Sequence, residues 1–175
     1  MTTETQLGKS QASATPKPVV NIDEVELVAS SVGDIFEERY APLSDVVGGR
    51  MLGYNLTIVP PGKRSCPFHS HRANEEMFFI VAGEGTYRFG EESYPVKAGD
   101  VCAAPAGGPE TAHHLINTGT RDLKYLGVST VIYPDICEYP DSGKFLATTG
   151  PGAQGHRFRF IGRKTTSLDY YDGEI

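Results

Sequence analysis

The sequence predicts an all-β fold. Its 175 residues include twenty glycines and twelve prolines but no tryptophan, which favours short elements joined by many turns over long helices. Across residues 48–133, short apolar stretches alternate with turn residues at the spacing of a β-sandwich or β-barrel. A chain of this length can bury most of one core, and it contains no internal repeat. We therefore expect a single barrel domain.

The strands are expected in the central part of the chain. Residues 52–59 read as a strand that stops at Pro60 and Pro61, and residues 77–82 are almost continuously apolar, as in a strand covered on both faces. Gly90, Glu91 and Glu92 suit a hairpin turn between two further strands. The full set of expected strands is 52–59, 77–82, 86–89, 93–96, 101–104, 114–117 and 123–133.

The two flanks are less regular. Residues 1–17 are polar and rich in Ser and Thr, which predicts a flexible tail, so the single domain should span residues 18–175 with its barrel core at about 48–133. An edge strand and a short irregular or helical piece near residues 34–40 should precede the barrel. Residues 134–155 carry several turn signals and should loop over the surface.

Composition limits the class of partner. The formal charge is −6 and the lysines and arginines are scattered, which disfavours a nucleic-acid surface. No apolar run is long enough to span a membrane, and the start does not resemble a secretory signal. We expect a cytoplasmic protein whose partner is a small molecule. The three cysteines form no close pair, which indicates free thiols; Cys66, three residues before a histidine, leaves a reactive role open.

Four residues stand out as candidate metal ligands. His69 and His71 are two positions apart, so in a strand both imidazoles point to one face. Glu76 can return a carboxylate to the same cavity at the head of the next strand, and His113 can add a third imidazole from a distant one. Three imidazoles and a carboxylate suit a divalent transition metal ion such as Fe, Mn, Ni, Cu or Zn.

These residues also occur in two longer motifs. Gly62, then His69-Ser-His71, Glu76 and Gly83 resemble the first motif of the cupin superfamily, and Gly99, Pro105-Ala-Gly107, His113 and Asn117 resemble the second. The run from Gly62 to His69 is one residue longer than the usual pattern. Five residues, rather than the usual two, separate Gly107 from His113. Both insertions fall in loops, where extra length costs little.

The motif spacing also chooses between neighbouring residues. Six residues separate Glu76 from Gly83, as the motif requires, so Glu75 is read as its solvated neighbour. Three residues separate His113 from Asn117, and a strand would place His114 on the opposite face.

The resemblance implies a double-stranded β-helix, or jelly-roll barrel, with flanking N- and C-terminal segments and a metal held by His69, His71, Glu76 and His113. It implies an enzyme acting on a small oxygen-rich molecule, such as a hydroxy or keto acid, a sugar derivative or a phenolic compound, by dioxygenase or isomerase/lyase-type chemistry. The alternative is a non-catalytic module that binds a small molecule. Apolar residues on both sides of the barrel further predict a homodimer, although both segments could instead fold over their own barrel.

Overall fold

The computed structural model describes residues 16–150 and 158–174. All but the last two residues of the expected tail at 1–17 lie outside the described residues. The described part is a β-barrel with little helix, which confirms the all-β jelly-roll prediction. Its strands are β1 (Val28–Val32), β2 (Phe36–Ala41), β3 (Leu52–Val59), β4 (Ser70–His71), β5 (Glu76–Ala82), β6 (Glu84–Phe89), β7 (Glu92–Lys97), β8 (Val101–Ala104), β9 (His113–Ile116), β10 (Leu123–Thr130), β11 (Asp135–Tyr139), β12 (Lys144–Thr148) and β13 (Arg159–Arg163).

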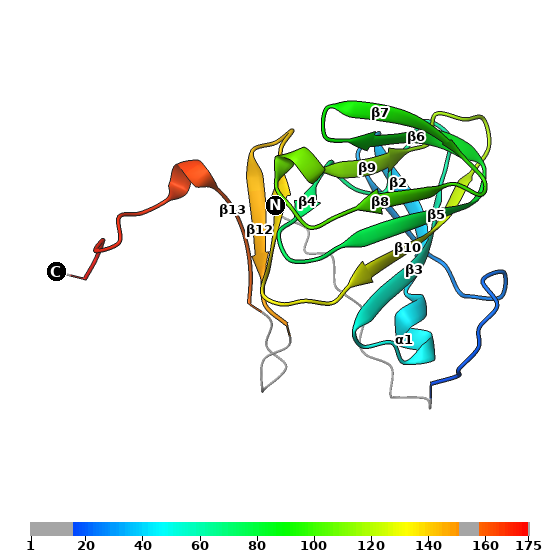
Figure 1. Ribbon diagram of the computed structural model, residues 1–175, viewed down its shortest axis with the longest axis horizontal. Helices are drawn as coiled ribbons and strands as arrows, with labels where there is room; N and C mark the ends of the chain where they lie inside the picture. The colour runs from blue at the N-terminus through cyan, green and yellow to red at the C-terminus, as the bar shows by residue number, and fades with distance from the viewer. Residues whose placement is uncertain (1–15, 151–157, 175) are drawn as a thin grey trace.

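Two walls of strands face each other across the core (Figure 1). One wall is a six-stranded sheet in the order β1-β2-β3-β10-β5-β8. The other begins with the three-stranded sheet β7-β6-β9 and continues, through a single bridge between His69 and His113, into the four-stranded sheet β13-β12-β11-β4. That bridge joins the two parts of the second wall, and the candidate metal site lies beside it.

An apolar cluster fills the space between the walls. Its members include Ile80 and Leu123, both fully buried. The chain passes from β5 in one wall to β6 in the other at Gly83, whose φ of 84° lies in the left-handed region, and a Cβ there would collide with the backbone of Asp122. The glycine of the first motif is therefore needed for the turn that returns the chain across the barrel.

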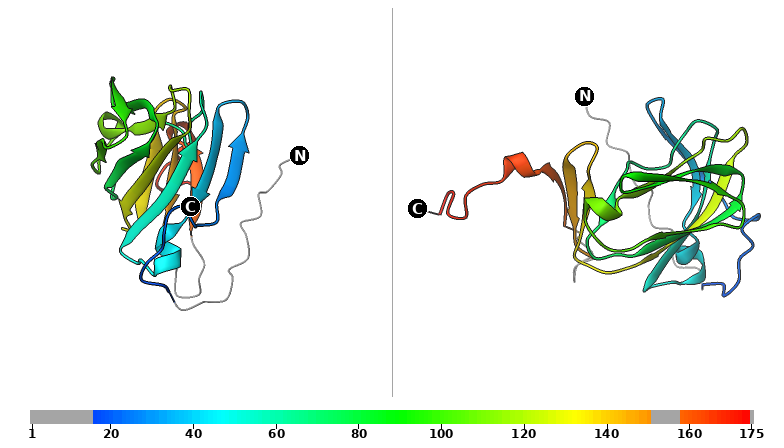
Figure 2. Two further views of the ribbon diagram at one scale, coloured as in Figure 1. Left: turned by 90° about the vertical axis from the view of Figure 1, so that its right-hand side faces the viewer. Right: turned by 45° about the horizontal axis from the view of Figure 1, so that its top comes forward.

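The segment after the barrel differs from the expectation of a surface loop. Residues 134–155 include β11 and β12, which pair with each other and, through β11, with β4. β13 extends this outer sheet, and beyond it the chain, with the 3-10 helix Lys164–Thr166, runs away from the body of the protein (Figures 1 and 2). The turn residues do form turns, but these turns separate strands of only five residues.

The N-terminal flank also corrects one expectation. Residues 36–41 form strand β2, not an irregular or helical piece, and β2 pairs with β3 at the edge of the large sheet. A short helix α1 (Leu43–Val47) follows. Apolar side chains before β1 pack on this region, against a small cluster made by Ala41, Leu43 and Leu56. None of the helices among the described residues is long and apolar enough to cross a membrane.

Candidate metal centre

His69 and His113 are opposite one another across the bridge between the two parts of the second wall. The backbone N–H of His113 donates to the carbonyl of His69 at 2.7 Å, and the N–H of His69 donates to the carbonyl of His113 at 3.2 Å. Residues that exchange both hydrogen bonds in an antiparallel pair project their side chains to the same face. Two imidazoles far apart in the sequence thus enter the barrel side by side, with ring centroids 4.8 Å apart.

His71 and Glu76 complete the group from two further positions. His71 ends β4, and Glu76 begins β5 in the opposite wall. The Oε2 atom of Glu76 lies 3.0 Å from Nε2 of His113 and 3.7 Å from Nε2 of both His69 and His71. The structure thus brings together all four residues that the sequence singled out.

Hydrogen bonds on the far side of each ring orient the three imidazoles. Nδ1 of His69 lies 2.8 Å from the carbonyl of Pro67, and Nδ1 of His113 lies 3.1 Å from the carbonyl of Thr111. A carbonyl only accepts, so both Nδ1 atoms must carry the proton. The same logic holds for His71, whose Nδ1 lies 2.6 Å from the carboxylate of Asp135. Each imidazole in its neutral form therefore turns an unprotonated Nε2 towards Glu76, as metal-bound histidines do.

The three imidazole Nε2 atoms and the carboxylate of Glu76 together favour a cation among them. Burial favours the neutral form of Glu76, but hydrogen bonds with His113 and His69 outweigh it and hold the pKa of the carboxyl well below its usual value. Such a hydrogen bond needs a proton on Nε2, because three unprotonated Nε2 atoms would turn their lone pairs towards the ionised carboxylate and repel it. Burial lowers the pKa of His69, yet its hydrogen bonds with Cys66 and Glu76 give a net upward shift. A proton on His69 or a metal ion among the four residues relieves the repulsion.

The site is buried on one side and open on the other. The side chain of His113 is only 2% exposed and lies against the rings of Phe78 and Tyr87, whereas those of His69, His71 and Glu76 keep 13%, 21% and 18% of their surface. Among the described residues, the exposed surface of the group therefore belongs to these three side chains, from whose side a small molecule could approach.

The neighbours that the sequence set aside lie elsewhere. Glu75 is exposed and uses its backbone N–H to bond the hydroxyl of Thr130. His114 is buried on the opposite face of β9, where its ring packs edge-on against Phe68. Neither side chain approaches the Nε2 atoms of the group.

Strand β11 adds residues that sequence reasoning missed. Asp135 holds Nδ1 of His71, and Cys137 lies directly opposite His71 in the pairing of β4 with β11. The ring of Tyr139 lies 6.2 Å from that of His69. The three residues alternate along the strand and so share one face. That alternation could have indicated a strand, but the turn residues on either side of it favoured a surface loop.

Among the described residues, two groups could hold a metal ion. The ligating atoms of His69, Glu76 and His113 all lie within 4.8 Å of one another, and so do those of His69, His71 and Cys137. His69 belongs to both groups. The protein therefore has His and Glu side chains that could hold a metal ion.

Comparison with known proteins agrees with the fold and the motifs. Residues 55–129 match the family model described as "Cupin domain". The oxalate-binding protein of Thermotoga maritima is 39% identical over 70 residues, a match that covers 40% of this chain and 54% of that protein, or about half its length.

Two solved structures extend the comparison. The crystal structure of a cupin-superfamily sugar phosphate isomerase from Silicibacter pomeroyi aligns with a TM-score of 0.72 at 24% identity, covering 89% of this chain and 98% of the other. The structure of a predicted oxalate decarboxylase from Thermotoga maritima aligns with a TM-score of 0.55 at 27% identity, covering 65% and 99%. Residues 55–129 of this chain therefore form a cupin domain.

Proposed function

We propose that the protein is a metal-dependent enzyme that binds one divalent transition metal ion through His69, His71, Glu76 and His113. The observation that supports this most strongly is the convergence of three imidazole Nε2 atoms on one carboxylate oxygen. Nitrogen and oxygen donors of this kind suit Fe, Mn, Ni, Cu or Zn. When bound, such an ion would polarise a carbonyl or carboxylate, or activate water.

The protein's own side chains would orient the substrate and exclude water. Phe78 and Tyr87 close the side of the site behind His113. The ring of Tyr139 lies 6.2 Å from that of His69, and the ammonium of Lys144 lies 4.8 Å from the centre of the Tyr139 ring. Tyr139 and Lys144 also line a cavity of about 120 Å³, which Glu138 lines too and to which none of the four proposed ligands contributes. The positive charge of Lys144 beside Tyr139 supports an anionic, oxygen-rich substrate such as a hydroxy or keto acid or an acidic sugar derivative.

The reaction class is proposed more broadly. Isomerase, lyase or dioxygenase chemistry on a small oxygen-rich molecule is consistent with the site. The sugar phosphate isomerase and the predicted oxalate decarboxylase to which this chain is similar support the same substrate chemistry. Phenolic compounds are also proposed as substrates, because aromatic side chains form the wall of the site. We further propose a cytoplasmic location, supported by three free cysteines.

A second candidate function is the non-catalytic capture of a small acid. The relative from Thermotoga maritima that is 39% identical is named for binding oxalate. A binding module would need the metal and the open side of the site, but no group that moves a proton.

Metal analysis followed by activity and binding assays tests both candidates. The purified protein should contain close to one divalent transition metal ion per chain, or take one up when reconstituted. Oxygen uptake and product formation should then be measured with small acids, sugar derivatives and phenolic compounds, beside calorimetric binding of the same panel. Turnover that is lost in Glu76→Ala supports the enzyme; tight binding without turnover supports the capture module. Absence of metal after reconstitution would exclude the proposed site.

We also propose that the protein is a homodimer formed through its C-terminal segment. Six apolar side chains of this segment are between 46% and 87% exposed, namely Phe158, Phe160, Ile161, Leu168, Tyr170 and Tyr171. In contrast, Val20, Ile22, Val25 and Leu27 pack against their own domain. The N-terminal segment is therefore largely covered by its own domain, although Val19 is 80% exposed, and the C-terminal segment offers the larger apolar surface to another subunit.

A further inference from the structure

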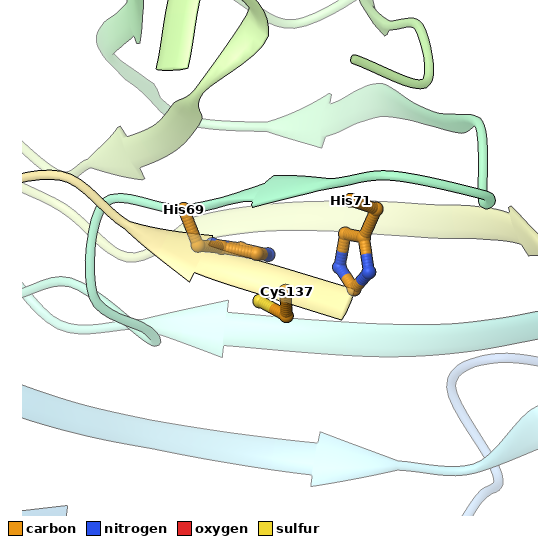
Figure 3. A group of neighbouring side chains, drawn as sticks. All are labelled: His69, His71 and Cys137. Carbon is orange, nitrogen blue, oxygen red and sulfur yellow. The ribbon is translucent and has the colours of Figure 1, made fainter. Parts of the chain in front are cut away.

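Strand β11 lies outside the part of the chain that matches the cupin domain, yet it supplies a thiol to the metal centre. Cys137 is 3% exposed and is the direct antiparallel partner of His71. Side chains of such a pair stand on the same face with their Cβ atoms about 5 Å apart. Figure 3 shows Cys137 beneath the rings of His69 and His71.

The thiol is close enough to share an ion with both rings. Sγ of Cys137 and one nitrogen each of His69 and His71 lie within 4.8 Å of one another. The ligating atoms of His69, Glu76 and His113 lie within the same limit. Nitrogen and thiolate donors together favour softer ions than nitrogen and carboxylate donors do.

The surroundings of Cys137 differ from those of a cysteine that only fills space. Cys102, equally buried, packs in the apolar core cluster between the two walls. Cys137 is absent from that cluster. Burial raises the pKa of its thiol, and Asp135 and Glu76 add to that rise, whereas His69 and the hydrogen bond with Tyr139 lower it. A metal ion beside His69 and His71 would favour the thiolate that burial disfavours.

Cys66 also lies near the site but approaches the wrong atom. Its Sγ is 3.8 Å from Nδ1 of His69, the nitrogen that donates to the carbonyl of Pro67. Nε2 of His69 faces Glu76 on the other edge of the ring. Cys66 therefore lies on the Nδ1 side of the imidazole, away from Glu76. Cys137, in contrast, projects to the same face of the sheet as His71.

We infer that Cys137, His69 and His71 form a second, softer ligand set that captures a thiophilic divalent ion such as Zn²⁺. This inference rests on the proposed use of His69 and His71 as ligands, but not on Glu76 or His113. Binding converts the thiol to a thiolate and releases its proton to solvent. The same centre would then hold a harder ion on the Glu76 side or a softer ion on the Cys137 side. The outer sheet would allow the softer ion to bind, because it contributes Cys137.

The test uses the full-length protein, stripped of metal and titrated with Co²⁺ and with Cd²⁺. Both ions give thiolate-to-metal charge-transfer absorption when sulfur is a ligand. We expect this band in the wild type at one ion per chain, and we expect its loss in Cys137→Ser. Cys102→Ser, matched in burial, and Cys66→Ser should both keep it. His113→Ala should keep the band, because His113 belongs only to the other ligand set.

Two results would overturn the inference. One is metal uptake by the wild type without a charge-transfer band, which would leave the proposed His and Glu site intact. The other is a band that survives in Cys137→Ser but disappears in Cys66→Ser. X-ray absorption on the wild type with Zn²⁺ bound gives a check that needs no variant, since a sulfur ligand lies at about 2.3 Å from zinc and nitrogen at about 2.0 Å. A shell of nitrogen and oxygen alone would also contradict the inference, whereas failure to bind any metal would overturn the proposed function as well.

Discussion

The carboxylate of Asp135 lies 2.6 Å from Nδ1 of His71 and thereby fixes which nitrogen of that imidazole is free. Asp135 is buried, and although burial favours its neutral form, the hydrogen bonds with His71, Asn74 and the backbone of Ala73 lower its pKa to about 2. The carboxylate is thus ionised at every pH at which the imidazole could bind a metal. Its partner His71 is a proposed ligand, so Asp135 acts on the ion only through that ring.

Asp135→Asn should weaken metal binding without removing a ligand. An amide is a poorer acceptor than a carboxylate, so His71 becomes less basic and less firmly oriented. Loss of such a partner typically costs about 10- to 100-fold in metal affinity. Competition with a chelator of known affinity measures the change. Asp141→Asn is the matched control, because Asp141 pairs with Arg88 away from the site and should leave metal affinity unchanged.

Single substitutions of the proposed ligands should distinguish them from their neighbours in sequence. Alanine at His69, His71, Glu76 or His113 removes a metal bond and should lower the metal content of the purified protein. Glu75→Ala should not lower the metal content, since Glu75 directly precedes β5 and its side chain is exposed. Elemental analysis provides the measurement, and an equal loss in Glu75→Ala would show that the assigned register is wrong.

Metal affinity should fall on acidification. Imidazole binds metal only when unprotonated, and histidines titrate near pH 6.5 when unperturbed. The pKa of His69 is raised despite its burial, because of its bonds with Cys66 and Glu76, so without metal this ring keeps its proton to higher pH. In the metal-free protein the raised pKa stabilises the fold at low pH, and that contribution fades as pH rises through it. Metal binding has the opposite pH dependence, because it requires the unprotonated ring and therefore stabilises the fold more as pH rises.

Thermal unfolding with and without metal measures this difference. The stabilisation by metal should be large at pH 8 and should shrink as pH falls below about 6.5, following the affinity. A stabilisation as large at mildly acidic pH as at neutral pH would contradict an imidazole-based site.

His114 should make the protein less stable in mild acid. Its burial and the charges of Arg64 and Arg88 lower its pKa to about 4, against small opposing effects of Asp141 and the backbone of Cys66. The unfolded chain therefore binds a proton between about pH 6.5 and pH 4 that the folded protein does not, and stability falls as pH falls through that range. Neither ring nitrogen makes a hydrogen bond of good geometry among the described residues.

His114→Leu should raise the free energy of unfolding by about 1 kcal/mol at neutral pH, because it removes buried polar atoms without partners. The gain should grow as pH falls from 7 to 5. His114→Gln separates the two causes: it should abolish the pH-dependent part while giving little gain at neutral pH. Urea denaturation at several pH values measures both variants, and a gain that does not change with pH would refute the assigned titration.

The mass of the protein in solution should be twice the 19.0 kDa of one chain. Light scattering coupled to gel filtration at micromolar concentration measures it. Truncation after Gly155 removes the exposed C-terminal apolar residues and should shift the mass towards that of a monomer while metal binding persists. Replacing Tyr170 and Tyr171 by Asp should act in the same direction without shortening the chain. A wild-type mass near that of one chain would contradict the dimer.

The barrel strands could be predicted because their signals are local. Strand β3 has the expected bounds of 52–59, and β5 begins only one residue before the expected 77. Apolar runs bounded by Pro or Gly mark both strands. Strand β2 was missed because its sequence, Phe-Glu-Glu-Arg-Tyr-Ala, is rich in charge and reads as helical. It is a strand because it pairs with β1 and with β3.

The outer part of the site depends on contacts between distant segments. His69, His71 and Glu76 lie close together in the sequence, so their convergence could be argued from spacing. Asp135 and Cys137 reach them only because β11 pairs with a two-residue strand more than sixty positions earlier. No short-range pattern predicts such a pairing, since register is set by the tertiary fold.

The narrow connection between the outer sheet and the barrel also gives the protein a place to open. Strand β4 is paired with β11 through two residue pairs, extended by one hydrogen bond from the amide of Arg72 to the carbonyl of Ile136. Few backbone bonds hold that edge, so brief local opening should expose the amides of β11 and β12 more often than those of the central strands. A ligand that engages His71 stabilises only the closed form. Hydrogen–deuterium exchange of β11 should therefore slow on metal binding, while the distant β6–β7 hairpin exchanges at an unchanged rate.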